Sequence, residues 1–105
     1  MTYFAFTLPA LKDRKLKIAV VYLHEECRFE LWLAAANRKI QVDYIEKLRH
    51  KDIGEYTLSQ AAPGVDAILY TTICEQPDFG HPEELKRLVE EKTLEFARNV
   101  ASLAA

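Results

Sequence analysis

Residues 16–41, LKIAVVYLHEECRFELWLAAANRKIQ, decide the fold of this chain. Two apolar runs flank a short polar break, HEEC, and this pattern predicts two strands joined by a hairpin loop. A two-residue primed turn favours Asn-Gly over Glu-Glu. We therefore expect a four-residue loop, His24 to Cys27, built on a type I turn, which tolerates glutamates.

This loop also sets the register of the two strands. On one face it places apolar residues opposite apolar residues, and a slip by a single residue would break the match. The predicted pairs on that face are Tyr22 with Phe29, Val20 with Leu31, and Ile18 with Leu33. We therefore predict that this face of the hairpin belongs to the core.

The opposite face of the hairpin mixes charged and apolar side chains. It is too apolar to be fully solvated, so either another element covers it or it is a contact surface. Trp32 is either core beneath a helix or, with Arg28, the anchor of a binding surface, since both residue types are enriched at binding hot spots. Arg28 and Glu30 are spaced to form a surface ion pair, which contributes about 0–1 kcal/mol. The residues of this face are Lys17, Ala19, Val21, Leu23, Arg28, Glu30 and Trp32.

The whole chain predicts an α+β fold with the antiparallel order β-β-β-α-β-α. Strands are expected at about 3–8, 16–24, 27–33 and 67–75, and helices at about 34–51 and 82–102, with a polar connector at 10–15. The fourth strand, within DAILYTTICE, also fits an apolar turn of helix. Three alanines favour a helix start at residue 34, and Pro82 suits the first position of the last helix. We expect a single domain over 1–105, with the helices on the apolar face of the sheet.

Composition excludes several classes of function. The chain has 105 residues, half of them apolar, and its net charge of −2 argues against nucleic acid, which needs a basic surface. Neither a signal peptide nor an apolar run of about 18 residues is present, so we expect a cytoplasmic protein with no membrane partner. Cys27 and Cys74 lack a CxxC spacing and predict free thiols in a reducing compartment.

The loop from His24 to Cys27 holds residue types that bind zinc. A structural zinc site needs four convergent ligands, and consecutive residues of one loop cannot all converge. A nucleophilic pair of Cys27 with His24 would need a third, orienting group, and the sequence offers none. A solvated turn is the simpler interpretation, and we expect neither a metal nor a cofactor.

The residues after the hairpin raise two further possibilities. Asn37, Arg38, Lys39 and Gln41 would suit an anion if a helix began there, but no glycine-rich loop precedes them, and a solvated cationic turn is simpler. A hairpin followed by a helix is also similar to the restriction-endonuclease core, which carries an Asp and a strand-borne Glu-x-Lys. The segment starting at Glu30 lacks that lysine, so we exclude an active nuclease.

Four segments, LHEECRFELWLAAANRKIQ, GVDAIL, QPDFG and VEEKTLEFARNV, resemble a prokaryotic family known as a domain of unknown function, the one numbered 7000. The most specific part is RFELWLAAANRKIQ, and the resemblance covers nearly the whole chain. We expect the chain to be a short form that matches the C-terminal part of that family. The resemblance implies no activity, cofactor or catalytic residue.

Two hypotheses of function follow. The first is a non-catalytic binding or self-association domain, a homodimer that buries the mixed face of the hairpin. The second is a small enzyme or ligand-binding domain, with a polar pocket at the hairpin and at the start of the central helix. A truncated remnant with no function of its own is a third possibility. The candidate ligand or partner residues are His24, Arg28, Glu30, Trp32, Asn37, Arg38 and Gln41.

Overall fold

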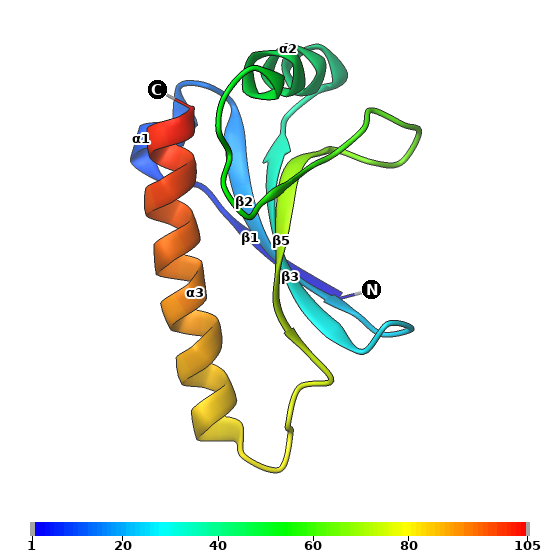
Figure 1. The fold of residues 1–105 in the computed structure, drawn as a ribbon, viewed down its shortest axis with the longest axis vertical. Coiled ribbons are helices and arrows are strands. Elements are labelled where there is room, and N and C mark those ends of the chain that lie inside the picture. The colour runs from blue at the N-terminus through cyan, green and yellow to red at the C-terminus, as the bar shows by residue number, and fades with distance from the viewer. Residues whose placement is uncertain (1, 105) are drawn as a thin grey trace.

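The computed structural model describes residues 2–104. Over this range five strands form one antiparallel sheet in the order β1-β2-β3-β5-β4, and three helices accompany it (Figure 1). The strands are β1 (Thr2–Phe6), β2 (Leu16–Leu23), β3 (Arg28–Ala35), β4 (Thr57–Leu58) and β5 (Ala67–Glu75). The helices are α1 (Pro9–Lys12), α2 (Arg38–Arg49) and α3 (Pro82–Leu103). The predicted α+β class is confirmed.

Strands β2 and β3 form the predicted hairpin in the predicted register. Tyr22 lies opposite Phe29, Val20 opposite Leu31, and Ile18 opposite Leu33. Residues 24–27 form the loop, and Cys27 closes it with a left-handed φ of 53°. The apolar match on one face is what selects this register, because a slip by one residue would turn that face to the other side.

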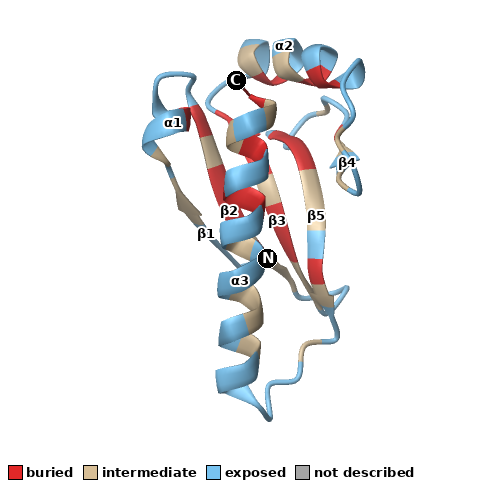
Figure 2. Ribbon diagram, turned by 60° about the vertical axis from the view of Figure 1, so that its left-hand side comes forward, coloured by how far each residue is buried: buried red, intermediate tan, exposed pale blue. Residues whose placement is uncertain are grey.

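Helix α3 lies along one face of the sheet and covers it (Figures 1 and 2). Its buried residues Phe96, Ala97 and Val100 pack in one cluster with buried residues of β2, β3 and β5. Pro82 stands in its first turn, as predicted. Helix α2 lies across one end of the sheet (Figure 1) and adds Ile45 and Leu48 to the same cluster. Among residues 2–104, no helix lies over the other face of the sheet (Figure 1).

Helix α2 begins at Arg38, so the predicted start at residue 34 was wrong. Ala34 and Ala35 continue β3 instead: both pair with β2, and Ala34 also pairs with β5. The amides of Ala35 and Ala36 donate to carbonyls that directly precede β5 and β2. These bonds outweigh the helix propensity of alanine, which is a weak preference. Asn37 then caps the helix, because its side-chain oxygen accepts a hydrogen bond from the amide of Ile40 at 3.0 Å.

Three short elements also differ from the predictions. Strand β1 ends at Phe6 rather than at residue 8, and α1 occupies part of the predicted polar connector. Pro9 presets the first turn of α1, and Leu11 anchors it because this side chain is fully buried. Strand β4, with two residues, lies in a segment predicted as loop. Elements this short carry too little periodicity to be found in a sequence. Strand β5 has the predicted bounds, 67–75.

Candidate functional site

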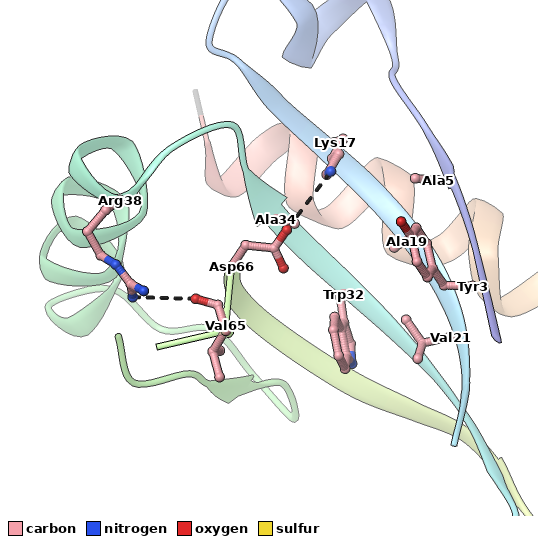
Figure 3. Close-up of a pocket in the computed structure, with 11 residues that line it drawn as sticks. Tyr3, Ala5, Lys17, Ala19, Val21, Trp32, Ala34, Arg38, Val65 and Asp66 are labelled. Carbon is pink, nitrogen blue, oxygen red and sulfur yellow. Dashed lines mark hydrogen bonds and ion pairs between the residues drawn. The ribbon is translucent and has the colours of Figure 1, made fainter. Parts of the chain in front are cut away.

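The uncovered face of the sheet holds a cavity of about 380 Å³, which we call the sheet hollow. Figure 3 shows its lining side chains on the near side of the strands, while α3 passes behind them. The lining residues come from β1, β2, β3, the start of α2 and the loop before β5. They are Tyr3, Ala5, Lys17, Ala19, Val21, Trp32, Ala34, Arg38, Gly64, Val65 and Asp66.

Small side chains form the floor of the sheet hollow. Ala5, Ala19 and Ala34 come from three adjacent strands, and Ala5 lies directly opposite Ala19. Alternate residues of a strand share one face, so these alanines lie on the same face as Trp32 and Val21. Ala19 lies opposite Trp32, the largest side chain of the lining. The depression therefore arises because small residues of adjacent strands stand beside the large side chain of Trp32.

A buried carboxylate holds Trp32 in place. Glu30 is only 4% exposed, and its two oxygens accept hydrogen bonds from Nε1 of Trp32 at 2.9 Å and from Nε of Arg28 at 2.7 Å. All three side chains share a face because they are two positions apart on β3. Burying a carboxylate is costly unless it is paired and hydrogen-bonded, and both conditions are met. The ion pair of Arg28 with Glu30 is therefore half-buried rather than a simple surface pair.

Trp32 is not core beneath a helix, which is one of the two interpretations that the sequence left open. The side chain is half-buried, it lies on the face without a helix, and it lines the sheet hollow. Its indole N–H is occupied by Glu30, so the ring has a defined orientation. An aromatic ring that is fixed before a partner arrives loses little conformational freedom on binding.

Charged groups stand at the rim of the sheet hollow. Nζ of Lys17 lies 3.9 Å from Oδ2 of Asp66, and both side chains are partly exposed. Arg38 donates to the carbonyl oxygens of Ala62 and Val65, which ties the first turn of α2 to the loop before β5. The charged lining residues are two cations and one carboxylate, so the rim has a net positive charge.

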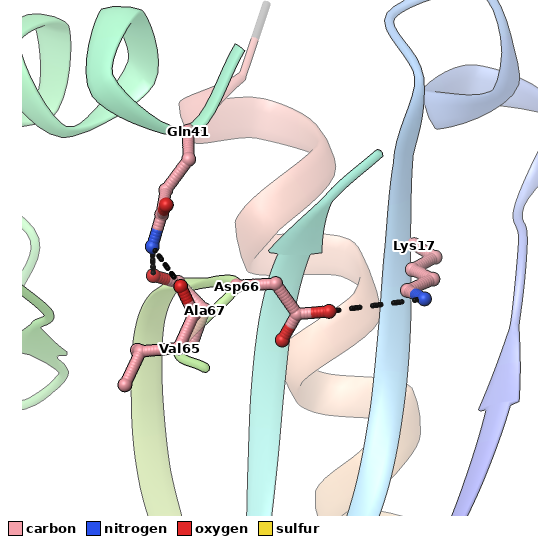
Figure 4. Close-up of polar contacts among 5 residues, drawn as sticks. All are labelled: Lys17, Gln41, Val65, Asp66 and Ala67. Atoms are coloured by element: carbon pink, nitrogen blue, oxygen red, sulfur yellow. Dashed lines mark hydrogen bonds and ion pairs between the residues drawn. The ribbon is translucent and has the colours of Figure 1, made fainter. Parts of the chain in front are cut away.

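Gln41 lies beneath this rim and is 1% exposed. Its Nε2 donates to the carbonyl oxygens of Val65 at 3.0 Å and Ala67 at 2.9 Å (Figure 4), and its Oε1 accepts from Arg38. The amide therefore joins α2 to the start of β5. No polar atom of this side chain is left for a ligand, so Gln41 has a structural role.

The predicted site residues divide into two groups. Trp32 and Arg38 line the sheet hollow, and Arg28 and Glu30 stand beside Trp32 on the same face. The other three do not line the hollow. Asn37 caps α2, and Gln41 is buried. His24 lies at the hairpin tip, where its Nε2 is 2.7 Å from Oγ1 of Thr2. The structure therefore does not join the hairpin tip and the start of α2 into one pocket.

Several lining residues of the sheet hollow were not among the predicted site residues. Tyr3 and Ala5 alternate along β1 and share a face, which was a usable signal once β1 was known to pair with β2. No sequence pattern identified Val65 and Asp66 as part of the site, because they lie in an irregular loop that comes close to β3 only in the folded chain. Lys17 was placed on the correct face of the hairpin, but nothing local linked it to Asp66.

The thiols lie outside the sheet hollow. Cys27 is exposed, Cys74 is half-buried, and both are free. Burial raises the pKa of the Cys74 thiol, which lowers the fraction of reactive thiolate at neutral pH. Within residues 2–104, no three His, Cys, Asp or Glu residues gather as a metal site would require. Over the same range, no helix combines the length and the apolar character needed to cross a membrane.

Comparison with known proteins gives one match. The model of the family DUF7000, a domain of unknown function, matches residues 1–104. No curated protein and no solved structure matches the chain.

Proposed function

The chain belongs to the DUF7000 family of domains of unknown function, and we propose that it is a non-catalytic, cytoplasmic binding domain that works as a homodimer. The proposed binding site is the sheet hollow, and the proposed ligand is a small, planar, apolar molecule with one anionic group. The observation that carries the proposal is an alanine floor beside the anchored ring of Trp32.

The size and lining of the sheet hollow support a planar apolar ligand. Its volume of about 380 Å³ falls within the range of about 300–1,000 Å³ that is usual for small-molecule sites. The rings of Trp32, on β3, and Tyr3, on β1, both line the sheet hollow (Figure 3). Stacking on such rings contributes about 0.5–1.5 kcal/mol beyond the area that is buried. The floor of alanines lets a flat molecule approach the strands closely.

The position of Lys17 supports the proposal that the ligand carries an anionic group. Its Nζ is 3.9 Å from Asp66, longer than a hydrogen bond, and the side chain is 41% exposed. The amine therefore has donors to offer a ligand. Arg38 already donates to three acceptors, so it acts as a fixed positive charge rather than as a new donor.

The chemistry of the lining supports a non-catalytic role. Among the described residues that line the sheet hollow there is no His, Cys, Ser or Thr. Nucleophilic and acid–base catalysis need a reactive group next to a second group that activates it. The nearest arrangement is Lys17 with Asp66, and both of these side chains are open to solvent. The alternative of a small enzyme has less support than a binding domain.

Self-association is supported by the apolar surface that the chain leaves exposed. The sequence predicts a homodimer that buries the mixed face of the hairpin. Val21 and Glu30 of that face are already buried within one chain, so they have little area left to offer a partner. Tyr3 and Phe4, at 62% and 67%, are far more exposed, and they are adjacent on one strand, β1, whereas Phe79 and Leu94, which are similarly exposed, lie apart in the chain. The contact between the two copies is therefore better sought at β1.

Two matched probes test the ligand class. 8-Anilinonaphthalene-1-sulfonate is an aromatic anion with a planar naphthalene ring, and N-phenyl-1-naphthylamine has the same rings without the sulfonate. We expect Lys17→Met to weaken binding of the sulfonate by about 2- to 5-fold, the effect of one partly exposed ion pair. Binding of the neutral probe should not change. Isothermal titration calorimetry measures both affinities.

Two further variants serve as controls. Lys39→Met removes a lysine that also pairs with a carboxylate, Asp43 at 3.1 Å, but does not line the sheet hollow. It should leave both affinities unchanged. Ala19→Leu fills the floor and should abolish binding of both probes. Equal effects of Lys17→Met and Lys39→Met, or normal binding to Ala19→Leu, would exclude the sheet hollow as the site.

A further inference from the structure

Strand β1 is an open edge of the sheet. It pairs with β2 over five consecutive residues without a bulge, and no strand in the described range pairs with its outer side. The opposite edge, β4, has only two residues. Natural sheets protect their edges with charges, prolines, bulges or very short strands. Beyond β4, residues 71–75 of β5 are also unpaired on that side within the part of the chain that the structure describes, but the pairing of β5 with β3 has two register irregularities and the strand ends in a charge, Glu75. Strand β1 has none of these devices.

The residues of β1 make this edge suitable for pairing with another strand. The strand reads TYFAF and contains no charged side chain. Tyr3 and Phe4 point to opposite faces, and each is exposed by more than half. The edge therefore presents unpaired backbone groups together with apolar surface above and below the sheet. Such an edge is a template for another strand.

We propose that β1 pairs, antiparallel and across a two-fold axis, with β1 of a second copy of this chain, so that the two sheets become one. This pairing rests on the homodimer of the proposed function and gives it a geometry. The midpoint of β1 is Phe4. The register in which all five residues pair therefore places Phe4 opposite Phe4 of the partner subunit, and Tyr3 opposite Ala5 of the partner subunit.

A second copy suits this edge because the strand is complementary to itself. A two-fold contact uses the same patch on both chains, so a charged residue near the axis would lie close to the identical charge of the second copy. Strand β1 has no charge to repel its copy, and Phe4 meets an identical apolar ring. Nor does the strand carry a charge that would select a different protein. These features favour a second copy over an unrelated strand.

The pairing also extends the ligand site. Tyr3 and Ala5 both line the sheet hollow from β1. Directly opposite residues of an antiparallel pair lie on the same face of a sheet. Tyr3 of the partner subunit therefore stands beside Ala5 and adds an aromatic wall to the open side of the hollow. The dimer carries two such sites, related by the two-fold axis.

Light scattering coupled to size exclusion tests the pairing. At about 100 µM, where a contact of micromolar affinity is occupied, the unmodified chain should have the mass of two chains. Phe4→Lys should have the mass of one, because it places like charges directly opposite each other. Leu94→Lys is the matched control. It changes another exposed apolar residue, on α3, and should remain a dimer.

A cross-link tests the register without relying on a loss of association. Opposed residues of an antiparallel pair have Cα atoms about 4.5–5.5 Å apart, a separation that a disulfide spans. Phe4→Cys, in a chain with Cys27→Ser and Cys74→Ala, should therefore form a covalent dimer on oxidation. Leu94→Cys in the same background should stay a single chain.

The outcomes separate this proposal from the one it rests on. A mass of one chain for the unmodified protein would overturn both the homodimer and the β1 pairing, but not ligand binding in the sheet hollow. A dimer that Phe4→Lys fails to dissociate, or a Phe4→Cys variant that does not cross-link, would overturn the β1 pairing alone.

Discussion

Replacing Phe96 with alanine is expected to lower the free energy of unfolding by about 3–5 kcal/mol. The ring is 1% exposed and belongs to the core cluster, where its centroid lies 5.1 Å from that of Tyr56. The substitution removes the favourable free energy of transferring the ring from water into the core, and it leaves a cavity between α3 and the sheet. Since a domain has a total stability of about 5–15 kcal/mol, this change removes a large share of it.

Urea denaturation followed by circular dichroism measures this effect. The matched control is Leu94→Ala, which shortens an apolar side chain of the same helix that is 63% exposed. It should change the free energy of unfolding by no more than about 0.5 kcal/mol, as is usual for surface sites. Equal losses for Phe96→Ala and Leu94→Ala would mean that α3 does not pack on the sheet through this face.

Gln41→Leu is expected to lower the free energy of unfolding by about 1–3 kcal/mol. The change preserves most of the side-chain volume but removes the donor that serves the carbonyl oxygens of Val65 and Ala67. A buried polar group left without a partner costs about 1–3 kcal/mol. Val65 keeps a weaker bond from Arg38 at 3.4 Å, so most of the loss falls on Ala67.

The same denaturation experiment on Gln60→Leu is the control. Gln60 is exposed in the loop before β5, and the identical chemical change there should have little effect. If Gln41→Leu proved as stable as the unmodified chain, the amide would not be what joins α2 to β5.

The hairpin could be predicted from sequence because its information is local. The apolar pairs Tyr22 with Phe29 and Val20 with Leu31 lie within a few residues of the loop, and they exclude a shifted register. The start of α2 could not be predicted in the same way. Ala34 and Ala35 are kept in a strand by Lys17 and Leu16 of β2 and, on the other side, by Ala67 and the carbonyl of Asp66, which are distant in the chain.

The candidate site was predictable only in part, for the same reason. A spacing of two placed Arg28, Glu30 and Trp32 on one face, and the structure agrees. The burial of Glu30 could not be predicted from the sequence, because it depends on the strands on either side. Val21 of β2 and Thr72 of β5 lie opposite it. The floor of the sheet hollow likewise needs β1 beside β2, which brings Ala5 to Ala19.

The indole N–H signal of Trp32 provides the most direct test of the central claim, that the sheet hollow is the binding site. The chain has one tryptophan, so a ¹H–¹⁵N correlation spectrum contains one indole signal. On titration with 8-anilinonaphthalene-1-sulfonate, this signal and the amides of Ala19 and Ala34 should shift with one common dissociation constant. Phe79 and Leu94 are exposed apolar residues outside the hollow, and their amides should not move. Shifts confined to those two residues, with an unmoved indole signal, would contradict the claim.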